Sequence, residues 1–176
     1  MISTTRIETE LGMMIAGATD EGICLLEYSD RRMLKTEYKD LEKFLKTTII
    51  EGDHIHFITL RQQLTEYFEG TRKEFTVPLI TPGTPFQQLV WKELTKIPFG
   101  TTRSYYEQSV AIGKPESIRA VANANGMNRI SIIIPCHRVI GSDGNLTGYG
   151  GGLGRKKWLL EHEKRYSGKS VELELF

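Results

Sequence analysis

Hydrophobic and polar positions follow two different periods in the first part of the chain. Two apolar runs, 12–18 and 22–28, are separated by a polar turn, and this arrangement predicts a β-hairpin. Apolar residues recur at helical spacing over 40–46 and 58–69, while residues 75–79 alternate as a strand does. We therefore expect a small α/β lobe that ends near residue 81.

The next helix is marked at its start. Residues 81–85 are rich in Thr, Pro and Gly and form the predicted domain boundary. Thr84 and Gln87 match a capping box, and Pro85 suits the first helical position. Apolar residues then recur at helical spacing as far as Leu94. This pattern predicts that a second domain opens with a helix.

Two short helices predicted over 105–112 and 116–125 lie on either side of a glycine turn, which is the outline of a helix-turn-helix. An Asp-Gly dipeptide between 139–140 and 146–149 predicts a hairpin, which in this position would be a wing. A final amphipathic helix is expected over 155–164. The predicted architecture is an α/β N-terminal lobe, a mainly α C-terminal winged helix-turn-helix domain and a short tail, over 1–81, 82–168 and 169–176.

The composition is that of an ordinary globular protein. The chain is 39% hydrophobic and 26% charged over 176 residues, which allows one domain or two small ones. It has no apolar run approaching the roughly 18 residues of a membrane span, and its N-terminus lacks the pattern of a signal peptide. Two cysteines do not make a disulfide framework. We expect a cytoplasmic protein without a membrane partner.

The small net charge of +1 conceals an asymmetry. Residues 1–81 carry ten Lys and Arg against fourteen Asp and Glu, whereas residues 82–168 carry twelve against six. A basic second half favours a polyanionic partner such as DNA, although an excess of this size also occurs by ordinary scatter.

Two histidines in the first half raise the question of a metal. His54 and His56 would share one face of a strand, but a structural zinc site needs four ligands and Cys24 is the only thiol nearby. Cys24 itself stands in an apolar run and is expected in the core. We therefore predict no metal site.

The candidate chemistry lies in the stretch IIIPCHRVIG. The three isoleucines Ile132–Ile134 predict a buried strand that Pro135 ends, so that Cys136 and His137 follow directly in a fixed loop. A free thiol has a pKa of about 8.5 and only the thiolate attacks, so a nearby imidazole base suits nucleophilic sulfur chemistry. A structural cysteine beside a surface histidine would give the same dipeptide.

The second half resembles the O6-alkylguanine-DNA alkyltransferases, also called methylated-DNA-protein-cysteine methyltransferases. Three segments carry the resemblance in family order and spacing, and PCHRV is the family's active-site signature. Together they cover about residues 82–165, and they are TPFQQLVWKELTKIPFGTTRSYYEQ, IRAVANANGMN and IIIPCHRVIGSDGNLTGYGGGLGRKKWLLEHE. The first lobe resembles the family's ribonuclease-H-like lobe more loosely.

The resemblance implies a set of catalytic roles. Cys136 would accept the alkyl group, His137 would be the base acting through a bridging water, and Glu163 would orient the imidazole. Asn128 would be the hinge residue that ties the turn before the reactive loop to that loop. No cofactor is implied.

The resemblance also implies a DNA interface, in which the helix-turn-helix enters the minor groove. Arg119 would replace the flipped base in the stack, and Tyr105 would help to rotate the nucleotide. Ala120 is one of the small residues that let the helix approach the DNA backbone. The base pocket would include the backbone of Val139 and Gly150, with Tyr149 beside them.

The chain departs from the family pattern at three positions. Gln108 and Ser109 stand where relatives usually have an apolar residue and alanine, which puts the packing of that helix in question. Gly150 replaces a residue that often has a side chain.

The function that this resemblance implies is DNA repair by direct reversal. One alkyl group would pass irreversibly from O6-alkylguanine in double-stranded DNA, with O4-alkylthymine as a further possible substrate, to Cys136. The expected partner is the damaged duplex, without an obligate protein partner. Two alternatives are a DNA-binding regulator with a buried cysteine and a cysteine hydrolase with a Cys136–His137 dyad, which needs direct hydrogen-bond reach between the two side chains.

Overall fold

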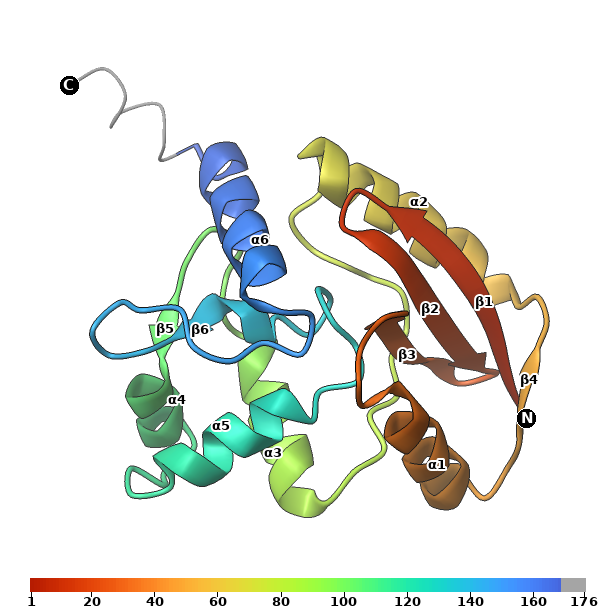
Figure 1. Cartoon of the computed structure of the whole chain (residues 1–176), viewed down its shortest axis with the longest axis horizontal. Helices are drawn as coiled ribbons and strands as arrows, with labels where there is room; N and C mark the ends of the chain where they lie inside the picture. The colour runs from red at the N-terminus through yellow and green to blue at the C-terminus, as the bar shows by residue number, and fades with distance from the viewer. Residues whose placement is uncertain (169–176) are drawn as a thin grey trace. The chain divides into compact units, whose positions relative to one another are not determined.

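A computed structural model describes residues 1–168, and the predicted tail 169–176 lies outside the described residues. The chain divides into two compact units (Figure 1). The first comprises Met1–Thr84 together with Arg129–Ser131, and the second comprises Pro85–Asn128 and the chain from Ile132 onward. A short segment from the middle of the sequence thus packs with the N-terminal unit.

The N-terminal unit is a four-stranded sheet with two helices, in the strand order β3-β2-β1-β4. Strands β1 (Ile2–Thr9), β2 (Gly12–Thr19) and β3 (Gly22–Tyr28) are antiparallel neighbours, and β4 (Ile49–Glu51) pairs parallel with β1. The predicted hairpin is confirmed as β2–β3. The sequence pattern missed β1 because only two of its side chains, Ile2 and Ile7, are buried hydrophobics.

Both predicted helices of this unit are present and start earlier than expected, as α1 (Leu34–Leu45) and α2 (Ile55–Glu69). The predicted strand over 75–79 is wrong, since only Leu79 makes an isolated bridge, to Ile23. Ile23 N donates to Pro78 O at 2.8 Å and Ile80 N donates to Ile23 O at 2.9 Å. Proline has no N–H with which to extend this pairing.

The two histidines of this unit have a structural role. The expectation that they lie on a strand is wrong. His54 is the N-cap of α2, and its Nδ1 accepts from His56 N at 3.2 Å. His54 Nε2 also contacts Asp20 Oδ1 at 3.1 Å. Within residues 1–168, no group of three or more His, Cys, Asp or Glu side chains could hold a metal ion.

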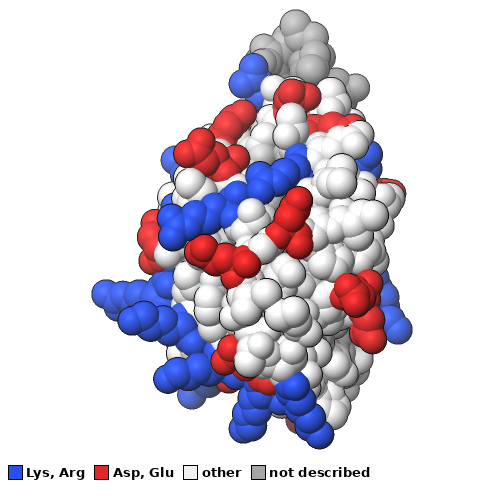
Figure 2. Space-filling view, turned by 90° about the vertical axis from the view of Figure 1, so that its right-hand side faces the viewer, with Lys and Arg blue, Asp and Glu red and all other residues white. Residues whose placement is uncertain are grey.

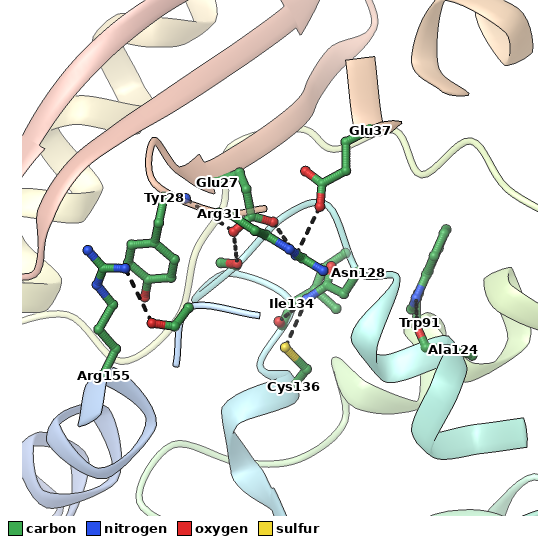
Figure 3. Close-up of polar contacts among 12 residues, drawn as sticks. Glu27, Tyr28, Arg31, Glu37, Trp91, Ala124, Asn128, Ile134, Cys136 and Arg155 are labelled. Carbon is green, nitrogen blue, oxygen red and sulfur yellow. Dashed lines mark hydrogen bonds and ion pairs between the residues drawn. The ribbon is translucent and has the colours of Figure 1, made fainter. Parts of the chain in front are cut away.

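The segment Arg129–Ser131 is anchored on β3. Leu26 N donates to Arg129 O at 2.9 Å, and Ser131 N donates to Leu26 O at 2.8 Å. Ser131 Oγ donates to Glu27 Oε1 at 3.1 Å, and Glu27 forms an ion pair with Arg31 (Figure 3). These hydrogen bonds make Arg129–Ser131 part of the N-terminal unit.

A second buried carboxyl shares this arginine. Arg31 Nη1 lies 2.9 Å from Glu37 Oε1 on α1. Burial and the neighbouring Glu27 raise the pKa of Glu37 to about 9, against the pull of Arg31. Burial likewise raises the pKa of Glu27. Two carboxyls facing one guanidinium therefore keep a proton between them at neutral pH.

The second unit is mainly helical. Its helices are α3 (Pro85–Leu94), α4 (Tyr105–Ala111), α5 (Ile118–Gly126) and α6 (Leu153–Tyr166), with a 3₁₀ turn η1 (Cys136–Arg138) between α5 and α6. All four helices were predicted. At the start of α4, Glu107 N donates to Ser104 Oγ at 3.0 Å, as a capping box requires.

The predicted hairpin of the wing does not form as a strand pair. Strand β6 (Val139–Ile140) instead pairs parallel with β5 (Arg103–Ser104). The loop that follows β6 runs on to α6, and within it Gly141 N donates to Asn145 O at 3.0 Å and Gly144 N donates to Gly141 O at 2.9 Å. The Asp143–Gly144 turn is therefore a loop feature.

The strand predicted for Ile132–Ile134 is also wrong, because these residues form a turn. Ile132 has a φ of 73° and is buried, as is Ile134. A run of β-branched residues signals burial, but a buried turn satisfies that signal as well as a strand does, provided that its backbone groups find partners.

The molecular surface carries both signs of charge. Figure 2 shows Lys and Arg side chains interspersed with Asp and Glu on the face that it presents. No helix within the described residues is long and apolar enough to cross a membrane. That the excess of Lys and Arg in residues 82–168 faces DNA stays a prediction.

Candidate active site

Cys136 is positioned by a tight turn. Pro135 has φ −83° and ψ 62°, the conformation of an inverse γ-turn, and Cys136 N donates to Ile134 O at 2.8 Å. Asn128 Nδ2 donates to the same Ile134 carbonyl at 2.9 Å and to Cys136 Sγ at 3.3 Å (Figure 3). The contact expected of Asn128 is therefore present, and it replaces the sheet hydrogen bonds that a strand would have made.

His137 is fully buried next to a buried carboxylate. Its Nε2 lies 2.7 Å from Glu163 Oε2 on α6, the contact that the sequence predicted. Because Glu163 accepts there, Nε2 carries the proton and Nδ1 is the basic nitrogen. Nδ1 is buried and has no hydrogen-bond partner among the described residues. The ring is therefore set to accept a proton at Nδ1.

Arg138 holds the same carboxylate from the other side. Its Nε and Nη2 donate to Glu163 Oε1 and Oε2 at 2.7 and 2.9 Å, and its Nη1 donates to Ile97 O at 2.7 Å. Gly100 N adds a fourth donor, at 3.2 Å from Glu163 Oε1. Paired in this way, the carboxylate is fixed in position and in charge.

These contacts set the protonation states of the site. Burial alone would raise the pKa of Glu163, but His137 and Arg138 outweigh it and hold this pKa well below its usual range. Burial lowers the pKa of His137, with Glu163 opposing and Arg138 and Lys156 adding to the effect. A neutral imidazole hydrogen-bonded to a carboxylate is the form that a general base needs at neutral pH.

Lys156 is a charged residue of the site that the sequence did not point out. It is completely buried on α6, and its Nζ donates to the carbonyls of Val139, Thr147 and Gly148 at 2.6, 2.9 and 3.1 Å. Burial lowers the pKa of Lys156 to about 8, while the Cys136 thiolate opposes this shift. Electrostatic coupling is reciprocal, so the Lys156 cation favours the thiolate.

A cavity of about 780 Å³ opens beside Cys136. Four of the predicted base-binding or DNA-binding residues line it, namely Tyr105, Arg119, Tyr149 and Gly150. Its wall is stiffened where Tyr105 Oη donates to Thr147 O at 2.8 Å. Helices α4 and α5 and the loop 147–150 thus enclose a space next to the thiol.

Two predicted residues lie elsewhere. Val139 is fully buried and contributes its carbonyl to Lys156, and Ala120 is exposed on α5; neither is among the residues that line the cavity. Arg138 and Lys156 are the functional candidates that sequence reasoning missed. Lys156 did leave a signal, because it is spaced three and seven residues before Leu159 and Glu163 and so shares the buried face of α6.

The chain is similar to known proteins over most of its length. Residues 85–165 match the model of the 6-O-methylguanine DNA methyltransferase DNA-binding domain. A methylated-DNA–protein-cysteine methyltransferase of Methanosarcina barkeri is 40% identical over 161 residues, which are 90% of this chain and 94% of that protein. One of Mycobacterium bovis is 57% identical over 114 residues, 65% of this chain and 68% of that protein.

The chain belongs to the methylated-DNA–protein-cysteine methyltransferase family. A crystal structure of Mycobacterium tuberculosis OGT in complex with DNA is similar, with a TM-score of 0.80, 41% identity and coverage of 93% of this chain and 94% of that one. The fold of this methyltransferase family member is accordingly mixed α/β, with a four-stranded sheet, a two-stranded sheet and six α-helices in residues 1–168.

Proposed function

We propose that this protein repairs DNA by direct reversal, transferring one alkyl group from O6 of guanine in duplex DNA to Cys136. The observation that carries the proposal is that Cys136 lines a cavity while its neighbour His137 is held by the buried carboxylate of Glu163 at 2.7 Å. The family membership makes this the expected activity.

The proposed reaction is a nucleophilic displacement at the alkyl carbon. His137 Nδ1 takes the thiol proton through a bridging water, and Sγ attacks the carbon as the carbon–O6 bond breaks. The bonding electrons stay on the guanine oxygen, and the guanine then takes up one proton to return to its keto form. The product at Cys136 is a thioether, and no reactant in the proposed reaction regenerates the thiol, so each molecule acts once.

The other site residues have supporting roles in this proposal. Glu163 keeps the proton of His137 on Nε2, Asn128 positions the thiol, and Lys156 favours the thiolate and fixes the loop 147–148. These roles need no cofactor or metal ion, and the groups that carry them all belong to the second unit.

The DNA-binding mode completes the proposal. Helices α4 and α5 would act as the helix-turn-helix, with the loop after β6 as its wing, and the first unit as the ribonuclease-H-like lobe. The functional division would follow the boundaries 1–81 and 82–168. Arg119 would fill the space left by the flipped nucleotide, and Tyr105 and the cavity wall at Tyr149 and Gly150 would receive the base. The setting would be the cytoplasm.

Intact-mass spectrometry tests the proposal. After incubation with excess duplex that contains O6-methylguanine, the chain should gain one methyl group, mapped to Cys136, and then stop reacting. Repeated turnover, or transfer that persists in Cys136→Ala, would refute it. A pure DNA-binding regulator would gain no mass, and a cysteine hydrolase would instead turn over ester substrates.

A further inference from the structure

The interface between α4 and α5 contains a buried pair of side-chain amides. Gln108 Nε2 donates to Asn125 Oδ1 at 2.9 Å, and Asn125 Nδ2 donates to Gln108 Oε1 at 2.7 Å. Gln108 is 0% exposed and Asn125 6% exposed, so bulk water has little access to the pair. Each amide therefore depends on the other.

This pair restricts the angle between the two helices. Two reciprocal N–H···O bonds form only when the two amide groups lie edge to edge and nearly in one plane, whereas an apolar contact has no preferred direction. Gln108 is the position at which the chain departs from the apolar residue usual in the family. The departure in sequence thus has a defined partner in the structure.

The pair is placed where a small rotation matters. Trp91 Nε1 donates to Ala124 O at 2.8 Å (Figure 3), so two adjacent residues at the C-terminal end of α5 are held. Arg119 lies six residues earlier, about 9 Å along the helix axis. A tilt of about 10° at Asn125 would move the backbone at Arg119 by roughly 1.5 Å.

On α4, the residue that the amide pair helps to position is Tyr105. It is the first residue of α4, one turn before Gln108, and its hydroxyl donates to Thr147 O. Tyr105, Arg119 and Asn125 all line the cavity that contains Cys136. The amide pair therefore joins the two helices, α4 and α5, that carry these cavity residues.

We propose that Gln108 and Asn125 are positioning residues that set α4 against α5, so that Tyr105 and Arg119 act together on a nucleotide in duplex DNA. This inference rests on the proposed alkyl transfer. Extraction of a base from the duplex requires both helices in register, whereas a free base needs only the cavity and the thiol. Loss of the pair should therefore slow transfer from duplex DNA selectively.

The test compares two substrates in Gln108→Met, which keeps the length of the side chain and removes its amide. One substrate is duplex DNA with a single O6-methylguanine, and the other is free O6-benzylguanine. Transfer to Cys136 from saturating duplex should fall about tenfold to hundredfold, the usual effect of a displacement of about 1 Å. Transfer from the free base should stay within about twofold of the unchanged chain. Gln62→Met, which changes an exposed amide on α2, is the matched control and should alter neither rate.

The outcomes separate a positioning role from a merely structural one. Equal losses with both substrates, or no loss with either, would overturn the inference. If Gln108→Met does not fold, as judged by circular dichroism, Gln108→Asn shortens the side chain while keeping an amide and must show the same selective loss. Failure of the unchanged chain to alkylate Cys136 with either substrate would instead refute the proposed function.

Discussion

Arg138 donates hydrogen bonds to both carboxylate oxygens of Glu163, from Nε to Oε1 at 2.7 Å and from Nη2 to Oε2 at 2.9 Å. The two residues lie 25 positions apart in the chain, and both are buried. The carboxylate that orients His137 is thereby locked in place before any substrate binds. The arginine of the PCHR motif is thus part of the site through its effect on Glu163.

Replacement of Arg138 should change the pH dependence of alkyl transfer. Arg138 helps to lower the pKa of His137, so Arg138→Met should raise that pKa. Because the neutral imidazole is the base, the fall in rate at low pH should move to higher pH. Removing one partner of a buried ion pair should also destabilise the fold by about 3–5 kcal/mol.

The measurement is the transfer rate from pH 5 to 8, with urea unfolding for stability. Arg138→Lys keeps the charge and should show a smaller displacement of the acid limb. An acid limb that does not move in Arg138→Met would show that Arg138 has no influence on the base.

Asn128 should matter to the thiol as well as to the fold. Asn128→Ala leaves Ile134 O without its side-chain donor and should cost about 1–3 kcal/mol of unfolding free energy. Asn128→Asp has the same shape but accepts only, and its negative charge opposes a thiolate at Sγ. The reaction of Cys136 with iodoacetamide at pH 7 should therefore be slower in Asn128→Asp than in Asn128→Ala. The reverse order would rule out an electrostatic contact between residue 128 and the thiol.

Lys156→Met should loosen the cavity wall and weaken the nucleophile. Three carbonyls lose their shared donor, and the positive charge that favours the Cys136 thiolate disappears. We expect a roughly tenfold lower iodoacetamide rate at pH 7, in line with the usual effect of a nearby opposite charge. We also expect faster proteolysis within 141–152. Lys157→Met, at the exposed neighbour on α6, is the control that should change neither.

The stability of the N-terminal unit should fall as the pH rises. The folded pKa of Glu37 is about 9, above its ordinary value of 4.5. The folded state thus binds a proton that the unfolded state has released, and the stability present below pH 4.5 is lost progressively up to about pH 9. Glu37→Gln should flatten this slope and raise the melting temperature at neutral pH by about 2–4 °C, corresponding to about 1 kcal/mol.

Thermal melting of both proteins between pH 5 and pH 9 checks this expectation. Glu69→Gln, an exposed change at the end of α2, should retain the slope of the unchanged chain. Parallel melting curves for the unchanged chain and Glu37→Gln would contradict the assignment of the proton to this pair.

The sequence alone determined the elements whose signals are local. Apolar spacing, with the Thr, Pro and Gly residues at 81–85, was enough to place helices α1 to α6 approximately, and the polar turn between two apolar runs was enough to find the β2–β3 hairpin. Glu163 was named only through the resemblance to the family, whereas the same local reasoning selected Cys136 and His137. Each of these signals involves residues within a few positions of one another, where the chain itself fixes the geometry.

Only the tertiary structure decided which polar groups are buried and what they contact. Burial of Arg138 and Gln108 depends on partners 25 and 17 positions away, which no local period encodes, and the spacing that places Lys156 on the buried face of α6 does not reveal the carbonyls that its Nζ contacts. Ile132–Ile134 carries the composition of a strand, yet it forms a turn because the side chain of Asn128 satisfies the carbonyl of Ile134 in place of a neighbouring strand. A hydrophobic pattern specifies that a segment is buried, but the available hydrogen-bond partners decide its conformation.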